Sequence, residues 1–345
     1  MKNNTQKKKF SRLCMPVTLY SLFLYVMSCS NEDFENTFFL FGAGIPENVK
    51  SIFKNSYQIP YYDKRKGLLK KKIFRVLFYY KYVKYFIIPQ WKKLDLYVND
   101  HLEPCPIFIG KKKYTLLEDG PHSNVCFEGG VLEKRDQTAR KMRAFKIRQF
   151  IYGPTFGYSF GRNKQCTDLL LGYMDDSEFI KSKRCRLIDF KKEWSACSEK
   201  KKRFILSMFN LTDEDLHFLK RYPIVLFTQP FYKRFINKEE HARIYKTIAK
   251  KYPKDKLIIK PHPRDDINYE EILPGYAVFR KKISSQMLEI LNVKWDRAIT
   301  VCSSSVFDFN YPIEKDWYGV ECSPMLKKKL GDSIKAPHDA NKCTL

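Results

Sequence analysis

The run Leu257-Ile258-Ile259-Lys260-Pro261-His262-Pro263 joins a short apolar segment to a polar turn marked by two prolines. A short, continuous apolar segment of this kind is typical of a strand that is buried on both faces. The prolines on either side of His262 cannot donate to a strand ladder, so the strand should end there. We therefore expect a buried strand that delivers Lys260 and His262 to one edge of a sheet.

The same pattern recurs along the chain, in which short apolar runs end in polar or Gly/Pro-marked turns and alternate with helix-length amphipathic stretches. The other runs are 95–98, 114–117, 224–227 and 298–301. Buried strands separated by helices indicate parallel sheets of the α/β class. Since a domain averages about 150 residues, 345 residues predict two Rossmann-like domains whose parallel sheets face each other across a cleft. We place the N-terminal domain at 8–205 and the C-terminal domain at 206–345.

Helix-start chemistry supports a second domain that opens shortly after this boundary. Thr212 is a suitable N-cap residue, and Asp215 occupies the third helical position, where a carboxylate suits the helix dipole. We expect a connecting helix to begin at this point.

The N-terminal region imitates a secretory signal, because Lys7–Lys9 precede the apolar stretch 13–29. We interpret it instead as part of the fold: a strand at 12–15, a helix at 17–27 whose first turn carries Pro16, and a strand at 38–41. A proline is compatible with the first turn of a helix.

The net charge of +26 attracts anions. Nucleic acid, acidic lipid head groups and an anionic donor or acceptor all fit this charge, and so does a merely solvated surface. The chain has no basic recognition helix, zinc-finger spacing or aromatic RNA-binding signature, so we do not expect nucleic acid as a partner. The ten cysteines include no Cys-x-x-Cys pair, which disfavours a zinc ribbon or redox motif and favours a reduced, intracellular protein.

Chemically active residue types gather directly after the expected strands. Glu118-Asp119-Gly120, Thr228-Gln229-Pro230, His262-Pro263 and Ser303-Ser304-Ser305 each follow an apolar run. Ligands of open α/β sheets bind beyond the carboxyl ends of the strands. We expect a helix to begin near Val306, so that the serine hydroxyls and backbone N–H groups form an anion site. The pairs Asp175-Asp176 and Asp265-Asp266 lack the Asp-x-Asp spacing of a metal motif, and we expect no metal.

Taken together, these motifs resemble the bacterial sialyltransferases. Thr228-Gln229-Pro230 and the run 260–265 most resemble the lipooligosaccharide sialyltransferases of glycosyltransferase family 52. The resemblance implies a GT-B fold and an inverting transfer from CMP-N-acetylneuraminic acid to a terminal galactose of lipooligosaccharide or a related glycan. It implies no cofactor beyond that donor, an acceptor-side N-terminal domain and a CMP-binding C-terminal domain.

The chemistry of this transfer assigns roles to the residues. The incoming hydroxyl must lose a proton and the departing phosphate must be stabilised. Asp119 is our candidate general base, and His262 our candidate general acid or electrostatic partner of the phosphate. Glu239 or Glu240 is an alternative base. Donor binding is assigned to Thr228, Gln229, Pro230, Lys260, Pro263, Ser303, Ser304 and Ser305.

Structural roles compete with each of these assignments. Glu118-Asp119-Gly120 could be a plain acidic turn, His262 a strand-end histidine, and the serines ordinary helix caps. Another transferase that uses CMP-Kdo or CDP-glycerol is the enzymatic alternative, because a fold does not determine the donor. A basic protein that binds nucleic acid or membrane is the non-enzymatic alternative.

The expected partners are the nucleotide sugar and a glycolipid or oligosaccharide acceptor. The basic, aromatic stretch 70–84 could lie on an anionic membrane or pack as a core helix. We expect a cytoplasmic protein with peripheral contact at the inner membrane, and a homodimer remains open.

Overall fold

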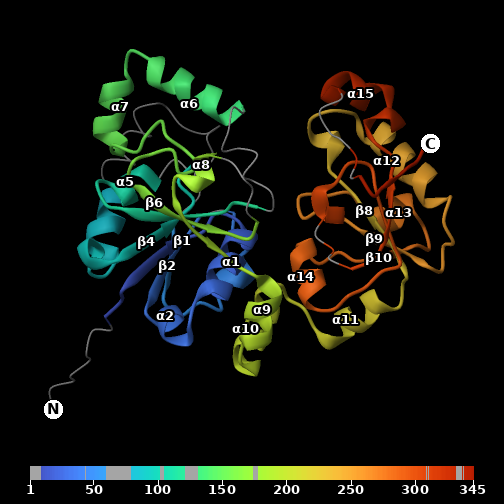
Figure 1. The fold of residues 1–345 in the computed structure, drawn as a ribbon, viewed down its shortest axis with the longest axis horizontal. Coiled ribbons are helices and arrows are strands. Elements are labelled where there is room, and N and C mark those ends of the chain that lie inside the picture. The colour runs from blue at the N-terminus through green and yellow to red at the C-terminus, as the bar shows by residue number, and fades with distance from the viewer. Residues whose placement is uncertain are drawn as a thin grey trace. The chain divides into compact units, whose positions relative to one another are not determined.

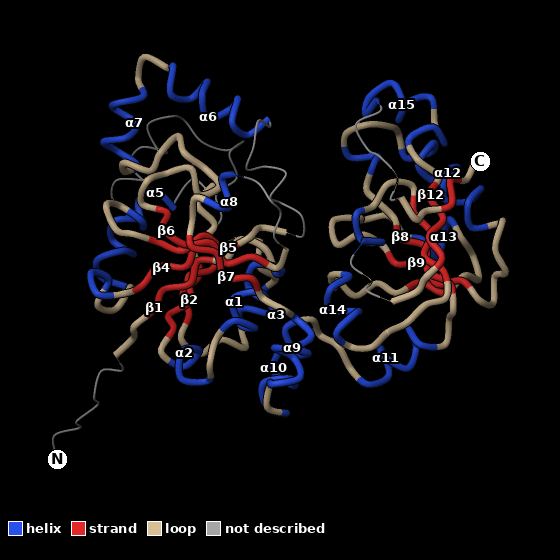
Figure 2. Tube along the Cα trace, in the orientation of Figure 1, coloured by secondary structure: helices blue, strands red, loops and turns tan. Residues whose placement is uncertain are grey.

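The computed structural model describes residues 9–42, 44–59, 79–101, 105–120, 131–173, 178–307, 309, 311–331, 336 and 338–345. The chain divides into two compact units, unit 1 (residues 1–201) and unit 2 (residues 202–345), and the division falls within helix α10 (Glu199–Met208). Each unit contains a central sheet with helices around it (Figures 1 and 2). Along the described chain, no helix is both long enough and apolar enough to cross a membrane.

The described part of unit 1 contains a seven-stranded sheet in the order β3-β2-β1-β4-β5-β6-β7, and all its strand pairs are parallel. The strands are β1 (Arg12–Met15), β2 (Thr37–Phe41), β3 (Ser56–Gln58), β4 (Asp95–Val98), β5 (Tyr114–Leu117), β6 (Cys166–Leu171) and β7 (Arg184–Leu187). The helices are α1 (Leu19–Ser28), α2 (Asn31–Glu35), α3 (Glu47–Lys50), the π-helix η3 (Val83–Ile87), the 3₁₀ turn η4 (Trp91–Lys93), α5 (Cys105–Ile109), α6 (Val131–Lys141), α7 (Phe145–Tyr152), α8 (Glu178–Lys181) and α9 (Phe190–Ala196).

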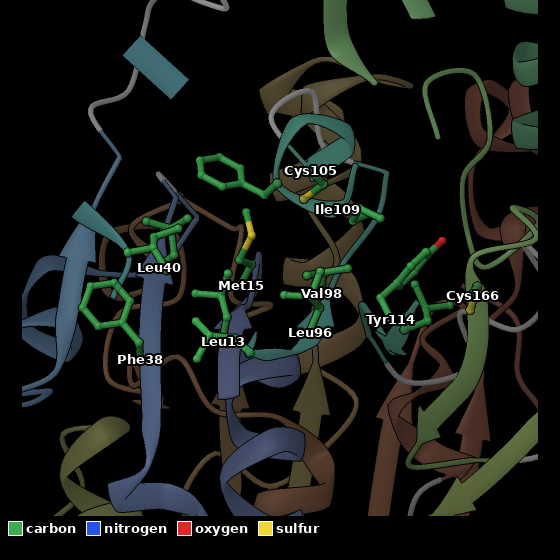
Figure 3. Close-up of a cluster of buried hydrophobic side chains, with 14 of the residues drawn as sticks. Leu13, Met15, Phe38, Leu40, Leu96, Val98, Cys105, Ile109, Tyr114 and Cys166 are labelled. Atoms are coloured by element: carbon green, nitrogen blue, oxygen red, sulfur yellow. The ribbon is translucent and has the colours of Figure 1, made fainter. Parts of the chain in front are cut away.

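Both faces of this sheet are buried, as a parallel sheet requires. Phe38 and Leu40 of β2 join the cluster that α5 covers, where Figure 3 shows them beside β1, β4 and β5. The alternate residues Phe39 and Phe41 point to the other face, where both rings contact Phe53. The strand therefore has no polar side, which explains its continuous apolar sequence.

The described part of unit 2 contains a six-stranded sheet in the order β10-β9-β8-β11-β12-β13, again with parallel pairs throughout. The strands are β8 (Ile224–Phe227), β9 (Leu257–Lys260), β10 (Ala277–Val278), β11 (Arg297–Thr300), β12 (Glu314–Trp317) and β13 (Asn341–Lys342). The helices are α11 (Asp213–Lys220), η6 (Phe231–Lys233), α12 (Lys238–Ala249), α13 (Tyr269–Ile272), α14 (Ser285–Ile290), η7 (Ser304–Phe307), η8 (Val320–Cys322) and α15 (Pro324–Leu330).

In both sheets the strand order reverses beside the first strand. The chain adds two strands on one side of it and then adds the remaining strands on its other side. This is the Rossmann strand order, and ligands bind at the switch point where the order reverses. The switch points lie between β1 and β4 in unit 1 and between β8 and β11 in unit 2. The predicted fold class, two parallel-sheet α/β domains, is confirmed.

The N-terminal apolar stretch is built into the fold as a strand, a helix and a second strand, but the helix begins later than predicted. Pro16 lies in the connection rather than in the first turn, and Thr18 is the N-cap. Its hydroxyl accepts from the Ser21 backbone N–H, and Ser21 returns a bond to the Thr18 backbone, which forms a capping box. The capping box outcompetes the proline as the start signal.

At the start of unit 2 the helix signal is confirmed. Thr212 is the N-cap of α11, and Asp215 completes its capping box. A local pattern sufficed here because both partners of the box lie within four residues of sequence.

Candidate functional site

The carboxyl end of β5 in unit 1 carries Glu118 and Asp119, and the two carboxylates have different environments. Glu118 is buried, and its Oε2 accepts from the Tyr20 hydroxyl at 2.9 Å and from the Gly172 N–H at 2.7 Å. These bonds connect the end of β5 to α1 and to the end of β6. Glu118 therefore has a structural role in this edge of the sheet.

Asp119 presents its carboxylate to the outside of the sheet edge. Its side chain is 24% exposed and its Oδ2 lies 3.8 Å from His101 Nε2, whereas its Oδ1 is buried and has no hydrogen-bond partner among the described residues. Its backbone carbonyl accepts from the Thr18 hydroxyl at 2.7 Å. The backbone is thus anchored to the cap of α1, while the carboxylate is partly exposed beside His101.

His101 was not singled out in the sequence, and it lies beside Asp119 because it follows β4, the neighbouring strand. Its ring stacks on Phe160, with centroids 4.8 Å apart and planes 9° apart. The signal was available: Asn99-Asp100-His101 directly follows the run 95–98 and so reaches the same edge as Asp119.

Asp100 holds the backbone of Phe160, on which the His101 ring stacks. Its carboxylate accepts from the Tyr114 hydroxyl at 2.6 Å and from the backbone N–H groups of Phe160 and Gly161 at 2.6 and 2.8 Å. Burial raises the pKa of Asp100, against the lowering effect of these bonds. The three bonds hold the Phe160 turn, which in turn fixes the plane of the His101 ring.

The corresponding edge of unit 2 is organised by Thr228 and Asp265. The Thr228 hydroxyl donates to Asp265 Oδ2 at 2.8 Å and accepts from the His262 N–H at 3.3 Å. The buried Asp265 also accepts from the Tyr269 hydroxyl at 2.8 Å. Thr228, predicted as a donor-binding residue, therefore positions the His262 backbone.

The geometry around His262 determines its tautomer. The Arg264 backbone N–H donates to His262 Nδ1 at 3.0 Å, so the neutral ring carries its proton on Nε2. Burial, followed by repulsion from Arg264 and Lys260, lowers the pKa of His262 to about 4. Near pH 7 the side chain is a neutral N–H donor.

Lys260 ends β9 as a buried side chain. Its Nζ donates to the Pro261 carbonyl at 3.0 Å, and burial lowers its pKa to about 7. Its Nζ also lies 6.0 Å from the centre of the Phe279 ring. A buried ammonium group has lost most of its hydration, and a nearby anion would favour its charged form. The Pro263 backbone follows directly in the turn that places His262.

Gln229 bridges the switch point of unit 2. Its side-chain amide donates to the Cys302 carbonyl at 3.1 Å, and its Oε1 accepts from the Cys302 N–H at 3.2 Å. These bonds join the end of β8 to the loop after β11, while Pro230 precedes the turn η6. The amide that was predicted to bind the donor thus positions the serine loop.

The serine run differs from the expected helix start. Ser304 and Ser305 lie within η7, a 3₁₀ turn of four residues, and no α-helix begins at Val306. The Ser303 hydroxyl donates to Ser305 Oγ at 3.0 Å and accepts from the Ser305 N–H at 3.3 Å. Bonds within the run compete with a longer helix, as short hydroxyl side chains commonly do. The Ser304 side chain lies outside the described residues.

The alternative bases lie in the first turn of α12. Glu239 is exposed, whereas Glu240 accepts two bonds of 2.7 Å from Arg243 and one of 2.7 Å from the Ser323 hydroxyl. The hydrogen bonds from Arg243 lower the pKa of Glu240. A carboxylate with a lowered pKa and committed oxygens is a weaker proton acceptor than one with a free oxygen.

Within the described residues, no group of three His, Cys, Asp or Glu side chains could hold a metal ion. A hollow of about 640 Å³ in unit 1 is lined by cations and lies at the amino ends of β5, β6 and β7. It is therefore at the edge of the sheet opposite Asp119. Its cationic residues are Lys113, Lys181, Lys183 and Arg184.

The sequence profile of glycosyltransferase family 52 matches residues 35–325. The chain belongs to glycosyltransferase family 52. As a family 52 member it is a glycosyltransferase, so a purely non-enzymatic role is set aside. It is also 30% identical to an uncharacterized protein of Haemophilus influenzae over 322 residues, which are 90% of this chain and 95% of that protein.

Solved structures show that this family 52 protein has the GT-B fold. A 2,6-sialyltransferase of Photobacterium sp. JT-ISH-224, solved with CMP and lactose, is 13% identical, with a TM-score of 0.53 over 89% of this chain and 71% of that chain. The GT-B domain of a Photobacterium damselae sialyltransferase is 12% identical, with a TM-score of 0.52 over 93% and 97% of the two chains.

Proposed function

We propose that this family 52 glycosyltransferase moves sialic acid, with inversion, from CMP-N-acetylneuraminic acid to a terminal galactose of lipooligosaccharide or a related cell-surface glycan. The observation that carries the proposal is the neutral His262, which presents an Nε2 proton at the carboxyl end of β9. The CMP and lactose bound to the similar Photobacterium enzyme support this choice of donor and acceptor class.

In the proposed reaction, the acceptor oxygen forms a bond to the anomeric carbon of sialic acid while the bond from that carbon to the CMP phosphate breaks. Asp119, whose carboxylate is partly exposed, takes the hydroxyl proton. His262 donates a hydrogen bond from its Nε2–H to a phosphate oxygen of CMP and stabilises the charge that develops there. Each role is proposed from the geometry within its own unit.

Donor binding would change the protonation of two groups in unit 2. A phosphate near Lys260 and His262 favours their charged forms, because an opposite charge raises the pKa of a basic group. Lys260, with a pKa of about 7, would become fully charged at modest cost. Thr228, Gln229 and Pro230 hold the strand ends in place, while Pro263 and the serine loop complete the proposed donor site.

The proposed reaction needs no metal, because a departing monophosphate ester develops less charge than a diphosphate and can be met by hydrogen bonds and a lysine. We also propose that the protein acts in the cytoplasm at the inner membrane, where a lipid-linked acceptor would lie.

The test is to incubate the purified chain with CMP-N-acetylneuraminic acid and lactose in the presence of EDTA, and to quantify CMP and sialyllactose by mass spectrometry. We expect metal-independent turnover that falls by about 10²–10⁴-fold in His262→Ala. His217→Ala, on α11, is the matched histidine control and should retain activity.

Two other outcomes would contradict the proposal. Turnover of CMP-Kdo or CDP-glycerol, without turnover of the sialic acid donor, would assign the protein to another glycan-assembly reaction. Turnover that EDTA abolishes and added Mg²⁺ restores would overturn the metal-free mechanism.

A further inference from the structure

Exposed apolar side chains gather in two segments of unit 1. Among the described residues, nine large hydrophobic side chains are exposed, and six of these lie within residues 82–86 and 142–150. Phe150 is 87% exposed and Phe86 is 77% exposed. Such concentration on the surface of a folded domain marks an interaction site, because scattered exposed residues are the normal case.

The first segment is the outer side of α7 with the turn before it, which we call the α7 face and define as Arg143, Lys146, Ile147 and Phe150. Ile147 and Phe150 lie three residues apart and hence on one side of the helix. The opposite side is anchored, since Tyr152 is buried against Ile107 of α5. Figure 1 shows α7 on the outside of unit 1, away from the strands.

The second segment is η3 with the residue before it, where Tyr82, Tyr85 and Phe86 are exposed. The Tyr82 and Phe86 rings stack on each other with centroids 5.4 Å apart, so they form one apolar surface. Lys84 points inward: its Nζ donates to the Ile107 carbonyl and lies 4.2 Å from the centre of the Trp91 ring. Tyr152 of α7 and Lys84 of η3 both contact Ile107, so both exposed segments are anchored to α5.

The charge of these two segments indicates which kind of partner they would bind. Residues 137–152 include five cations, Arg140, Lys141, Arg143, Lys146 and Arg148, and no Asp or Glu. Residues 79–93 include four lysines and again no acidic residue. Apolar and aromatic side chains interleaved with cations are the composition of segments that lie in the interface of an anionic bilayer.

We propose that the α7 face and the Tyr82–Phe86 ring pair together form a docking surface for the head-group layer of an anionic lipid bilayer. The apolar side chains enter the boundary between head groups and acyl chains, and the cations bind lipid phosphates. Of the stretch 70–84, which the sequence suggested for membrane contact, residues 70–78 lie outside the described residues, and the proposal does not use them.

The proposal is independent of the transfer reaction, because its assay needs neither donor nor acceptor. The full-length chain is sedimented with vesicles of phosphatidylcholine, with and without phosphatidylglycerol. We expect binding only to the anionic vesicles, and about tenfold weaker binding for Ile147→Ser/Phe150→Ser. Arg143→Glu/Lys146→Glu should lose the preference for anionic lipid.

The control is Leu187→Ser/Met325→Ser, which removes two other exposed apolar side chains, 50% and 42% exposed, and should bind like the parent. Circular dichroism checks that each variant is folded, and Phe86→Ser replaces any that is not. Parental vesicle binding by both the α7 variant and Phe86→Ser would overturn the proposal. Failure of the parent protein to bind vesicles would also overturn the proposal. So would a parent protein that is a dimer together with an Ile147→Ser/Phe150→Ser variant that is a monomer, since the surface would then bind a second copy.

Discussion

At the residue scale, the two neighbouring carboxylates of the Glu118-Asp119 pair separate into different roles. Both are acidic residues at one strand end, yet Glu118 is buried and holds α1 and β6, while Asp119 is partly exposed beside His101. The difference arises because successive residues leaving a strand point to opposite sides. An acidic turn motif is thus half structural and half available for chemistry.

The identity of the base is tested by comparing Asp119→Asn with Glu240→Gln. We expect Asp119→Asn to lower kcat by about 10²–10⁴-fold and to abolish the acidic limb of the pH–rate profile, because the ionised group is gone. Glu240→Gln should retain that limb, since its carboxylate is committed to Arg243 and Ser323. The reverse pattern would move the role of base to α12.

His101 should orient Asp119, because the two side chains are 3.8 Å apart and the imidazole is held on Phe160. His101→Ala is expected to lower kcat by about tenfold without a change in the KM for the donor. His101→Gln keeps an N–H donor and should recover part of the loss. An equal loss of kcat in both variants would indicate that the ring only fills space.

At the element scale, the capping box of α1 connects helix formation to the site. The Thr18 hydroxyl accepts from the Ser21 N–H and donates to the Asp119 carbonyl. One side chain thus ends the β1–α1 connection and holds the β5 end. In unit 2, the Gln229 side chain likewise connects two strand ends, since it follows β8 and bonds to Cys302 after β11.

Thr18→Ala should therefore lower both stability and activity. Loss of the cap is expected to reduce the free energy of unfolding by about 1–2 kcal/mol, and the released Asp119 backbone should reduce kcat. Thr18→Ser keeps the hydroxyl and serves as the control. Urea unfolding measures the first effect, and a stability loss without any change in kcat would show that the bond to Asp119 is not needed for activity.

At the scale of the whole molecule, the two units should respond differently to acid. His241 and His262 both lie in unit 2, and burial lowers the pKa of each to about 4. In the unfolded chain they titrate near 6.5. Between these values the unfolded state binds more protons, so the stability of unit 2 is present above pH 6.5 and is lost as the pH falls toward 4.

The measurement uses tryptophan fluorescence, because Trp295 and Trp317 lie in unit 2 and Trp91 and Trp194 in unit 1. With Trp91 and Trp194 replaced by Phe, the signal reports unit 2 alone. We expect its free energy of unfolding to fall between pH 6.5 and 4 by up to about 1.4 kcal/mol per pH unit for each histidine. His241→Gln should flatten this slope, and an unchanged slope in the variant would refute the assignment.

Short-range patterns in the sequence predicted much of this fold. The strand at 114–117 ends where predicted, and the Thr212 cap begins α11, because both depend on residues only a few positions apart. The same placement at strand ends identified Asp119 and His262 as candidates and, through their motifs, suggested family 52. By contrast, the start of α1 and the turn after Ser303 were mispredicted, since in each a local hydroxyl network competed with a simpler helix signal.

The sequence by itself determined the α/β class, the two parallel sheets and the residue types at their edges, because strand burial and turn chemistry are written locally. Only the tertiary structure decided what each edge residue does. It brought His101 beside Asp119 from a different strand, and it set the His262 tautomer through the Arg264 N–H. It also showed that Thr228 bonds to the His262 backbone and that Gln229 bonds to the loop after β11. These outcomes depend on contacts across strand ends and on the direction of each side chain, which no spacing along the chain specifies.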